Sequence, residues 1–223
     1  MQTIAIILLC VSVVCAQAPV VDLGYVKYAG GHNATTGINY YRGIHYAESP
    51  TGNLRWREPV PIEQNTSYVD QTIDATQEGP GCYQGTPFWS GPPSPAPLGV
   101  SVQSEDCLLL DVLVPVQPNS PHLPVMVQIH GGGYTEGSAS TVAPGDALVN
   151  ASNGGLIYVQ IQYRLGMWGF LGGHEIAENG VRNAGLYDQR AALDWVQRHI
   201  SAFGGDPAKV TIIGNNIHPP IFC

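Results

Sequence analysis

Four short runs rich in valine, isoleucine and leucine constrain the fold of this chain more than any other feature. They lie at Leu108–Val114, Val125–Ile129, Leu156–Tyr163 and Val210–Ile213. Runs of this length with little polar alternation are typical of strands buried on both faces of a largely parallel sheet. Between the last two runs, Asn183–Phe203 predicts a helix, because its apolar side chains recur at helical spacing: Leu186, Leu193, Val196, Ile200 and Phe203. Strand, helix and strand in this order predict an α/β fold.

The composition narrows the class of protein. Charged residues make up 12% of the 223 residues and hydrophobic residues 44%, which excludes an intrinsically disordered chain. The formal net charge of -8 argues against a surface that neutralises phosphates, so we expect no nucleic acid partner. The length alone fits one domain of ordinary size.

The amino terminus carries the pattern of a secretory signal peptide. Ile4–Val14 is an apolar run too short to span a bilayer, and Ala16-Gln17-Ala18 gives the small-x-small pattern that signal peptidase accepts. No Lys or Arg precedes the run, and a buried first strand or an anchor is the alternative. We expect residues 1–18 to be removed, and the mature protein to be secreted, extracellular and without a membrane span.

The cysteines and sequons fit an oxidising compartment. Cys82 and Cys107 could close a loop as a disulfide, or they could be two free buried thiols, and Cys223 is left without a partner. Three sequons for N-glycosylation begin at Asn33, Asn65 and Asn150. Such sequons suit the surface of a secreted protein.

A run of glycines directly follows the second apolar run, in His130-Gly131-Gly132-Gly133-Tyr134. Consecutive glycines leave backbone N–H groups accessible to an anionic oxygen, which an oxyanion hole requires. A P-loop would end in Gly-Lys-Ser or Gly-Lys-Thr, and a dinucleotide fingerprint beginning at Gly131 would need glycine where Glu136 stands. Both motifs are therefore excluded, and a glycine-rich turn without chemistry is the remaining alternative.

Six segments together resemble the type-B carboxylesterases and lipases, and they come in the order of that family. They are Gly43–Pro50, Leu54–Trp56, Glu105–Val112, His130–Gly133, Tyr163–Leu171 and Gly185–Pro207. The resemblance implies an incomplete α/β-hydrolase fold, with a mostly parallel central sheet and a small amino-terminal antiparallel portion. It also implies that the full-length parent hydrolyses a small-molecule carboxylic ester or a lipid by a serine, an acid and a histidine, with neither cofactor nor metal.

The resemblance also implies roles for individual residues. The N–H groups of Gly132 and Gly133 would form two-thirds of the oxyanion hole, and a Cys82–Cys107 disulfide would close a flap over the active-site gorge. Two pairs match positions that form buried salt bridges in the family, namely Arg55 with Glu105 and Arg164 with Asp188. Three aromatic residues would line the gorge entrance, or would simply cover the core: Phe88, Trp89 and Tyr134.

The family pattern breaks at the position of the nucleophile. In α/β-hydrolases this serine lies in Gly-x-Ser-x-Gly, at a sharp turn between a strand and a helix. Here Val210–Ile213 leads to Gly214 as expected, but Asn216 occupies the serine position and His218 the second glycine position. An amide does not attack an ester as a deprotonated hydroxyl does. The acid and the histidine of the triad would follow later in the chain, which ends at Cys223.

A rebuilt triad is an alternative, with Ser138 or Ser140 near the glycine run as its nucleophile. It lacks a base, because we expect His130 to be structural and His199, close to the end of the predicted helix, to be exposed.

Three functions are compatible with these observations. The chain could be the amino-terminal part of a secreted ester hydrolase, a non-catalytic extracellular binding module of the same family, or an inert fragment. For the polypeptide as it stands we favour the last. We expect residues 19–214 to be the amino-terminal part of a carboxylesterase type-B domain, truncated at the nucleophile elbow, and residues 215–223 to be a divergent tail. Without nucleophile, acid and histidine, we expect no activity.

Overall fold

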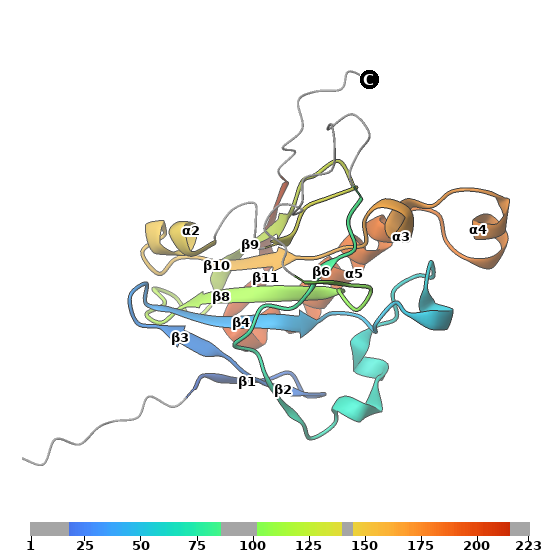
Figure 1. Ribbon diagram of the computed structural model, residues 1–223. Coiled ribbons are helices and arrows are strands. Elements are labelled where there is room, and N and C mark those ends of the chain that lie inside the picture. Colours follow the sequence, from blue (N-terminus) through green and yellow to red (C-terminus); the bar gives the residue numbers. More distant parts are fainter. Residues whose placement is uncertain (1–17, 86–101, 140–144, 215–223) are drawn as a thin grey trace, which may run out of the picture.

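A computed structural model describes residues 18–85, 102–139 and 145–214 (Figure 1). Its main element is a six-stranded sheet with the strand order β11-β9-β10-β8-β4-β3. In chain order these strands are β3 (Gly31–Asn33), β4 (Ile38–His45), β8 (Leu109–Pro115), β9 (Leu123–Ile129), β10 (Ile157–Ile161) and β11 (Gly205–Gly214). Strand β9 is parallel to both β10 and β11, and the other neighbouring pairs are antiparallel.

Two small sheets and several helices accompany the central sheet. The small sheets consist of β1 (Val20–Asp22), β2 (Lys27–Ala29) and β5 (Thr72–Asp74), and of β6 (Gly81–Cys82) and β7 (Gln103–Ser104). The α-helices are α2 (Gly145–Ala151), α3 (Gly166–Phe170), α4 (His174–Asn179) and α5 (Ala184–His199). The 3-10 helices are η1 (Gly52–Leu54), η2 (Ile62–Gln64), η3 (Thr66–Tyr68) and η5 (Ile200–Phe203). In the described ranges, no helix has the length and apolar character needed to cross a bilayer.

Strands β8 and β10 of the central sheet are buried on both faces, whereas β11 at its edge is largely exposed, contrary to the expectation for Val210–Ile213. Val112 of β8 belongs to the same hydrophobic cluster as Trp195 of α5. Its neighbour Leu113 belongs to a second cluster, with Val149 of α2. Because successive side chains of a strand point to opposite faces, α5 and α2 cover the two sides of the sheet. This two-sided burial explains why β8 and β10 are nearly continuous apolar runs.

The α/β class is confirmed, but the antiparallel portion is larger than the sequence predicts. Strand β8 was expected to belong to a largely parallel sheet, yet it pairs antiparallel with both β10 and β4. Within the described residues, three of the five neighbouring pairs of the central sheet are antiparallel. A continuous apolar run indicates burial on both faces but does not encode the direction of its neighbours, so this orientation could not be predicted.

The predicted helix is confirmed, with one error in its buried face. Helix α5 and the following η5 cover nearly the whole predicted range, and Trp195 and Phe203 are buried. Leu186, however, is 44% exposed. The first turn of α5 instead packs closely against Arg164 through Gly185. A Cβ atom on Gly185 would lie 2.4 Å from the carbonyl oxygen of Arg164. Consecutive helical residues are about 100° apart, so this close approach turns Leu186 outward.

Candidate active site

A cleft of about 270 Å³ lies where strands β9 and β11 end. Its lining residues are Ile129, His130, Gly131, Gly133, Tyr134, Tyr163, Gln189 and Gly214. They come from the end of β9 and the loop after it, from Tyr163 just after β10, from α5 and from the end of β11. Ligand sites of α/β sheets lie at the carboxyl ends of parallel strands, and this cleft has that position.

The loop after β9, residues 130–137, is called the glycine loop below, and glycine is required at two of its positions. Gly132 has a φ of 120°, and a Cβ atom there would lie 1.9 Å from the carbonyl oxygen of Glu136. Gly137 has a φ of 113°, and its Cβ atom would lie 2.2 Å from the carbonyl oxygen of Gly131. Any other residue would therefore force the loop open.

The backbone of the glycine loop leaves the N–H groups of Gly132 and Gly133 available. The N–H groups of Thr135 and Glu136 both donate to the carbonyl oxygen of Gly132, each over 3.1 Å. Among the residues that the structure describes, no acceptor receives the N–H group of Gly132 or of Gly133. Gly133 lines the cleft, and Gly132 beside it is buried. Free neighbouring N–H groups beside a cleft can bind an anionic oxygen.

His130 holds the glycine loop from within the protein, as the expectation of a structural role requires. Its side chain is buried, and Nδ1 lies 2.9 Å from the carbonyl oxygen of Gly131, so Nδ1 carries the hydrogen and donates it. The ring stacks on that of Tyr163, whose hydroxyl donates to the carbonyl oxygen of His130 over 2.9 Å. Burial lowers the pKa of His130 from 6.5 to about 4. The imidazole is therefore neutral at pH 7.

The burial of His130 predicts a loss of stability in acid. Its pKa in the folded protein lies below the ordinary value, so between pH 6.5 and about 4 the unfolded chain binds more protons than the folded one. We expect the free energy of unfolding to fall by up to about 1.4 kcal/mol per pH unit as the pH decreases through this window.

Urea titrations of the parent and of His130→Gln across this window measure that slope. The glutamine can still donate to Gly131, but it does not titrate. His174→Gln is the matched control, because the side chain of His174 is 79% exposed. Equal slopes for the parent and His130→Gln would show that the prediction is wrong.

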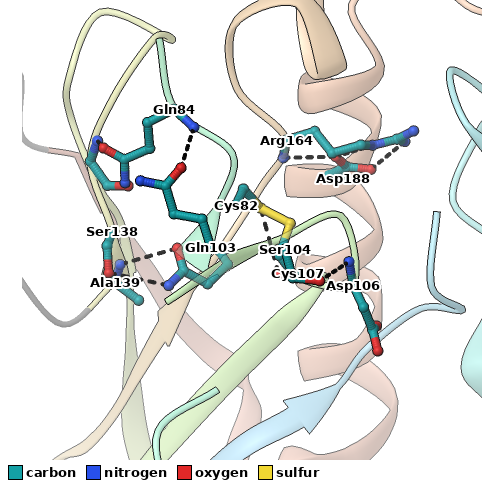
Figure 2. Close-up of a disulfide and its surroundings, with 12 residues drawn as sticks. Cys82, Gln84, Gln103, Ser104, Asp106, Cys107, Ser138, Ala139, Arg164 and Asp188 are labelled. Atoms are coloured by element: carbon teal, nitrogen blue, oxygen red, sulfur yellow. Dashed lines mark hydrogen bonds and ion pairs between the residues drawn. A yellow bond between two sulfur atoms is a disulfide. The ribbon is translucent and has the colours of Figure 1, made fainter. Parts of the chain in front are cut away.

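The disulfide implied by the resemblance is present in the structure (Figure 2). The Sγ atoms of Cys82 and Cys107 are 2.02 Å apart, and their Cα atoms 5.1 Å. Strands β6 and β7 pair beside it, with Cys82 opposite Ser104. Phe88 and Trp89, which the resemblance places at the gorge entrance, lie outside the described residues, as does Cys223.

The two expected ion pairs also form, and they differ in burial. Nε and Nη2 of Arg164 donate to the two carboxylate oxygens of Asp188 over 2.8 and 2.7 Å, and the side chains are 4% and 0% exposed. The backbone N–H of Arg164 donates to the same carboxylate over 3.0 Å. Arg55 makes two bonds of 2.6 Å to Glu105, but its side chain is 35% exposed. The second pair is therefore only partly buried, contrary to the expectation.

The expected glycosylation acceptors differ in accessibility. Asn150 is exposed on α2, whereas Asn33 and Asn65 are half-buried. Nδ2 of Asn65, the atom that a glycan would modify, donates to Glu48 over 3.0 Å. Asn150 therefore has the most accessible acceptor of the three.

Among the described residues, the remaining candidates do not assemble a triad. Ser138 is buried and its Oγ accepts from Nε2 of Gln162 over 3.2 Å. His199 was expected to be exposed, which is wrong. Its side chain is 13% exposed, because Nε2 lies 2.6 Å from Oε1 of Glu63, which covers it. Ser140 and Asn216 lie outside the described residues.

Tyr134 lines the cleft and is 52% exposed, with its ring 4.8 Å from that of Phe170. It therefore does not cover the core. Within the described ranges, no three His, Cys, Asp or Glu side chains are placed to hold a metal ion.

Two glutamines that no motif indicated contact the end of the glycine loop and the residues directly after it. Nε2 of Gln84 donates to the carbonyl oxygen of Gly137 over 2.7 Å, and the N–H of Gly137 donates to Oε1 of Gln84 over 3.1 Å. Oε1 of Gln162 accepts from the N–H of Ala139 over 3.3 Å. The only sequence signal for either residue is that Gln84 follows Cys82 by two positions.

Comparisons with known proteins agree with this architecture. The profile of the family described as "Carboxylesterase family" matches residues 17–217. Carboxylesterase patB of Penicillium expansum is 34% identical over 249 residues, covering 91% of this chain and 44% of the relative. Lipase 4 of Diutina rugosa is 38% identical over 218 residues, covering 90% and 38%. The crystal structure of Aspergillus niger EstA superposes with a TM-score of 0.74 at 37% identity, covering 88% of this chain and 35% of that one.

The described part of the chain thus has the architecture of an α/β-hydrolase, with a glycine loop at the carboxyl end of β9. The chain belongs to the carboxylesterase family. It spans 44% and 38% of the lengths of the two relatives named above.

Proposed function

We propose that this chain is the amino-terminal part of a secreted carboxylic ester hydrolase in which the glycine loop forms most of the oxyanion hole. One observation carries the proposal: the N–H groups of Gly132 and Gly133 have no acceptor among the described residues, and their loop lines the cleft at the end of β9. When an ester is attacked, its carbonyl oxygen becomes negatively charged. Two fixed N–H donors stabilise that charge in the transition state.

The chain does not itself supply the nucleophile. Gly214 brings the end of β11 to the cleft, and Asn216 stands two positions further on, where the resemblance places the catalytic serine. A carboxamide does not form an acyl-enzyme. We propose that the chain is inactive as it stands. The hydrolysis of carboxylic esters or lipids would belong to a full-length parent that adds a serine, an acid and a histidine.

The processing of the chain belongs to the same proposal. Residues 1–18 would be removed as a signal peptide, and the glycosylated form would carry its glycans at Asn33, Asn65 and Asn150. The exposure of Asn150 supports this. Residues 19–214 would form the amino-terminal part of the hydrolase domain, and residues 215–223 the divergent tail.

Incubation with short-chain nitrophenyl esters tests the absence of a nucleophile. We expect no release of nitrophenol above the uncatalysed rate, and no covalent labelling by a serine-directed fluorophosphonate, because neither reagent meets an activated hydroxyl. Labelling in mass spectra of the intact chain would contradict the proposal, and the labelled peptide would identify the nucleophile.

The oxyanion role is tested by joining residues 19–214 to the part of carboxylesterase patB that begins at the position aligned with residue 215, so that the joined protein includes the position of the serine. We expect ester hydrolysis by the joined protein and a loss of kcat of about 100-fold in its Gly132→Ala variant. Gly172→Ala is the matched control, since nothing lies within 4 Å of a Cβ atom at that position. Equal kcat values for the two variants would refute the role of Gly132.

A further inference from the structure

The side chain of Gln84 bonds both polar groups of one backbone residue. Its carboxamide accepts from the N–H of Gly137 and donates to the carbonyl oxygen of Gly137, over 3.1 and 2.7 Å. Gly137 is buried, so these groups have no access to water as an alternative partner. The next residue, Gly85, donates its N–H to the carbonyl oxygen of Thr135 over 2.7 Å. The segment 84–85 therefore holds the last three residues of the glycine loop.

Gly137 in turn contacts the peptide unit that carries the N–H group of Gly132. A Cβ atom on Gly137 would lie 2.2 Å from the carbonyl oxygen of Gly131 and 2.6 Å from Nδ1 of His130. That carbonyl belongs to the same planar peptide unit as the N–H of Gly132. A shift of Gly137 would therefore move or tilt the Gly132 N–H group.

Gln84 is itself held by the disulfide loop. Its backbone N–H donates to Oε1 of Gln103 over 3.1 Å (Figure 2), and Gln103 lies in β7, which pairs with β6. Cys82, two residues before Gln84, is bonded to Cys107. Gln84 therefore lies in a loop that the disulfide closes. This loop is held by the pairing of β6 with β7 and not by the central sheet.

We propose that Gln84 is a positioning residue for the oxyanion hole, which sets the Gly131–Gly132 peptide unit by holding Gly137 between the disulfide loop and His130. The proposal rests on the function proposed above for the glycine loop. Gln84 lines no part of the cleft, so it acts through Gly137 and does not contact the substrate.

Amide hydrogen exchange of the full chain, resolved by residue with NMR, tests this role without any enzymatic activity. Gln84→Met keeps the length of the side chain and removes both hydrogen bonds. We expect exchange of the Thr135, Glu136 and Gly137 amides to accelerate about tenfold, and that of the Val127 amide in β9 to stay unchanged. The first two amides donate to Gly132 and not to Gln84, so their acceleration reports transmission along the loop.

Gln84→Glu provides a test within one folded protein. Its carboxylate at pH 7.5 can accept from Gly137 but repels the carbonyl oxygen, whereas the protonated acid offers one donor and one acceptor, as the carboxamide does. At pH 3.5, below the ordinary glutamate pKa of about 4.3, we expect the accelerated exchange to recover relative to the parent at the same pH. Gln77→Met is the matched control, because Gln77 is exposed and its side chain bonds only its neighbour Thr76 among the described residues.

Uniform acceleration that includes Val127, no acceleration in Gln84→Met, or no recovery of Gln84→Glu in acid would each overturn the proposal. These outcomes differ from a failure of the proposed function. If Gln84 governs exchange in the loop while Gly132→Ala leaves kcat of the joined protein intact, the loop is positioned as inferred but is not an oxyanion hole.

Discussion

Arg164→Met is expected to lower the free energy of unfolding by about 3–5 kcal/mol, the largest effect of any single substitution considered for this chain. The reason is that the substitution leaves the buried carboxylate of Asp188 without its partner. The side chain of Asp188 is 0% exposed, and two of its bonds come from the guanidinium group. Without Arg164 the carboxylate is buried with only the backbone N–H of residue 164 as a donor, far from water that could solvate its charge.

Urea denaturation at pH 7, followed by tryptophan fluorescence, measures this loss. Arg182→Met is the matched control, because Arg182 is exposed. The double variant Arg164→Met, Asp188→Leu should regain part of the stability, since it removes the unpaired charge but leaves the Arg57 carbonyl without its donor. A loss below about 1 kcal/mol, the range of exposed ion pairs, would contradict the buried pair.

Reduction of the Cys82–Cys107 bond is expected to cost about 3 kcal/mol. The bond spans a sequence separation of 25 residues, and opening it restores the conformational freedom of that loop in the unfolded chain. Because the glycine loop is attached to this segment through Gln84, reduction should also accelerate exchange of the Gly137 amide.

The comparison is best made between the oxidised and reduced forms of residues 19–223 carrying Cys223→Ser, so that neither Cys10, Cys15 nor Cys223 offers a thiol that can exchange with the bond. Urea titrations with and without a phosphine reductant give the difference in the free energy of unfolding. The double variant Cys82→Ala, Cys107→Ala controls for effects of the reductant. Indistinguishable midpoints for the oxidised and reduced forms would show that the bond does not stabilise the fold.

The strands and the helix of the core could be predicted from the sequence, because buried segments are rich in apolar residues. Strands β8 and β10 and helix α5 all lie where apolar runs and helical spacing place them. Strand direction leaves no such trace, which is why the orientation of β8 was missed. The outward position of Leu186 was missed because it depends on the close approach of Gly185 to Arg164, a tertiary contact.

In the candidate site too, some residues could be predicted from the sequence and others could not. Gly132 and Gly133 could be singled out, because the glycine run follows a buried strand and the resemblance to type-B carboxylesterases implies their role. Gln84 and Gln162 could not, because a polar residue in a loop is ordinary and only the folded chain brings it against Gly137 or Ala139. The burial of His199 was missed for a related reason, since its partner Glu63 is distant in sequence.

The strand order of the central sheet has a consequence for synthesis on the ribosome. Strands β3, β4 and β8 can pair in the order in which they emerge, but β9 cannot join them, because β10 lies between β8 and β9. The glycine loop therefore follows a strand that has no neighbour in the sheet until residues up to 161 are available for pairing. Tyr163 and Gly166, which bond to the loop at His130 and Tyr134, emerge directly afterwards. When the chain folds from its amino terminus, the glycine loop and the two residues that bond to it are therefore placed together in one late step.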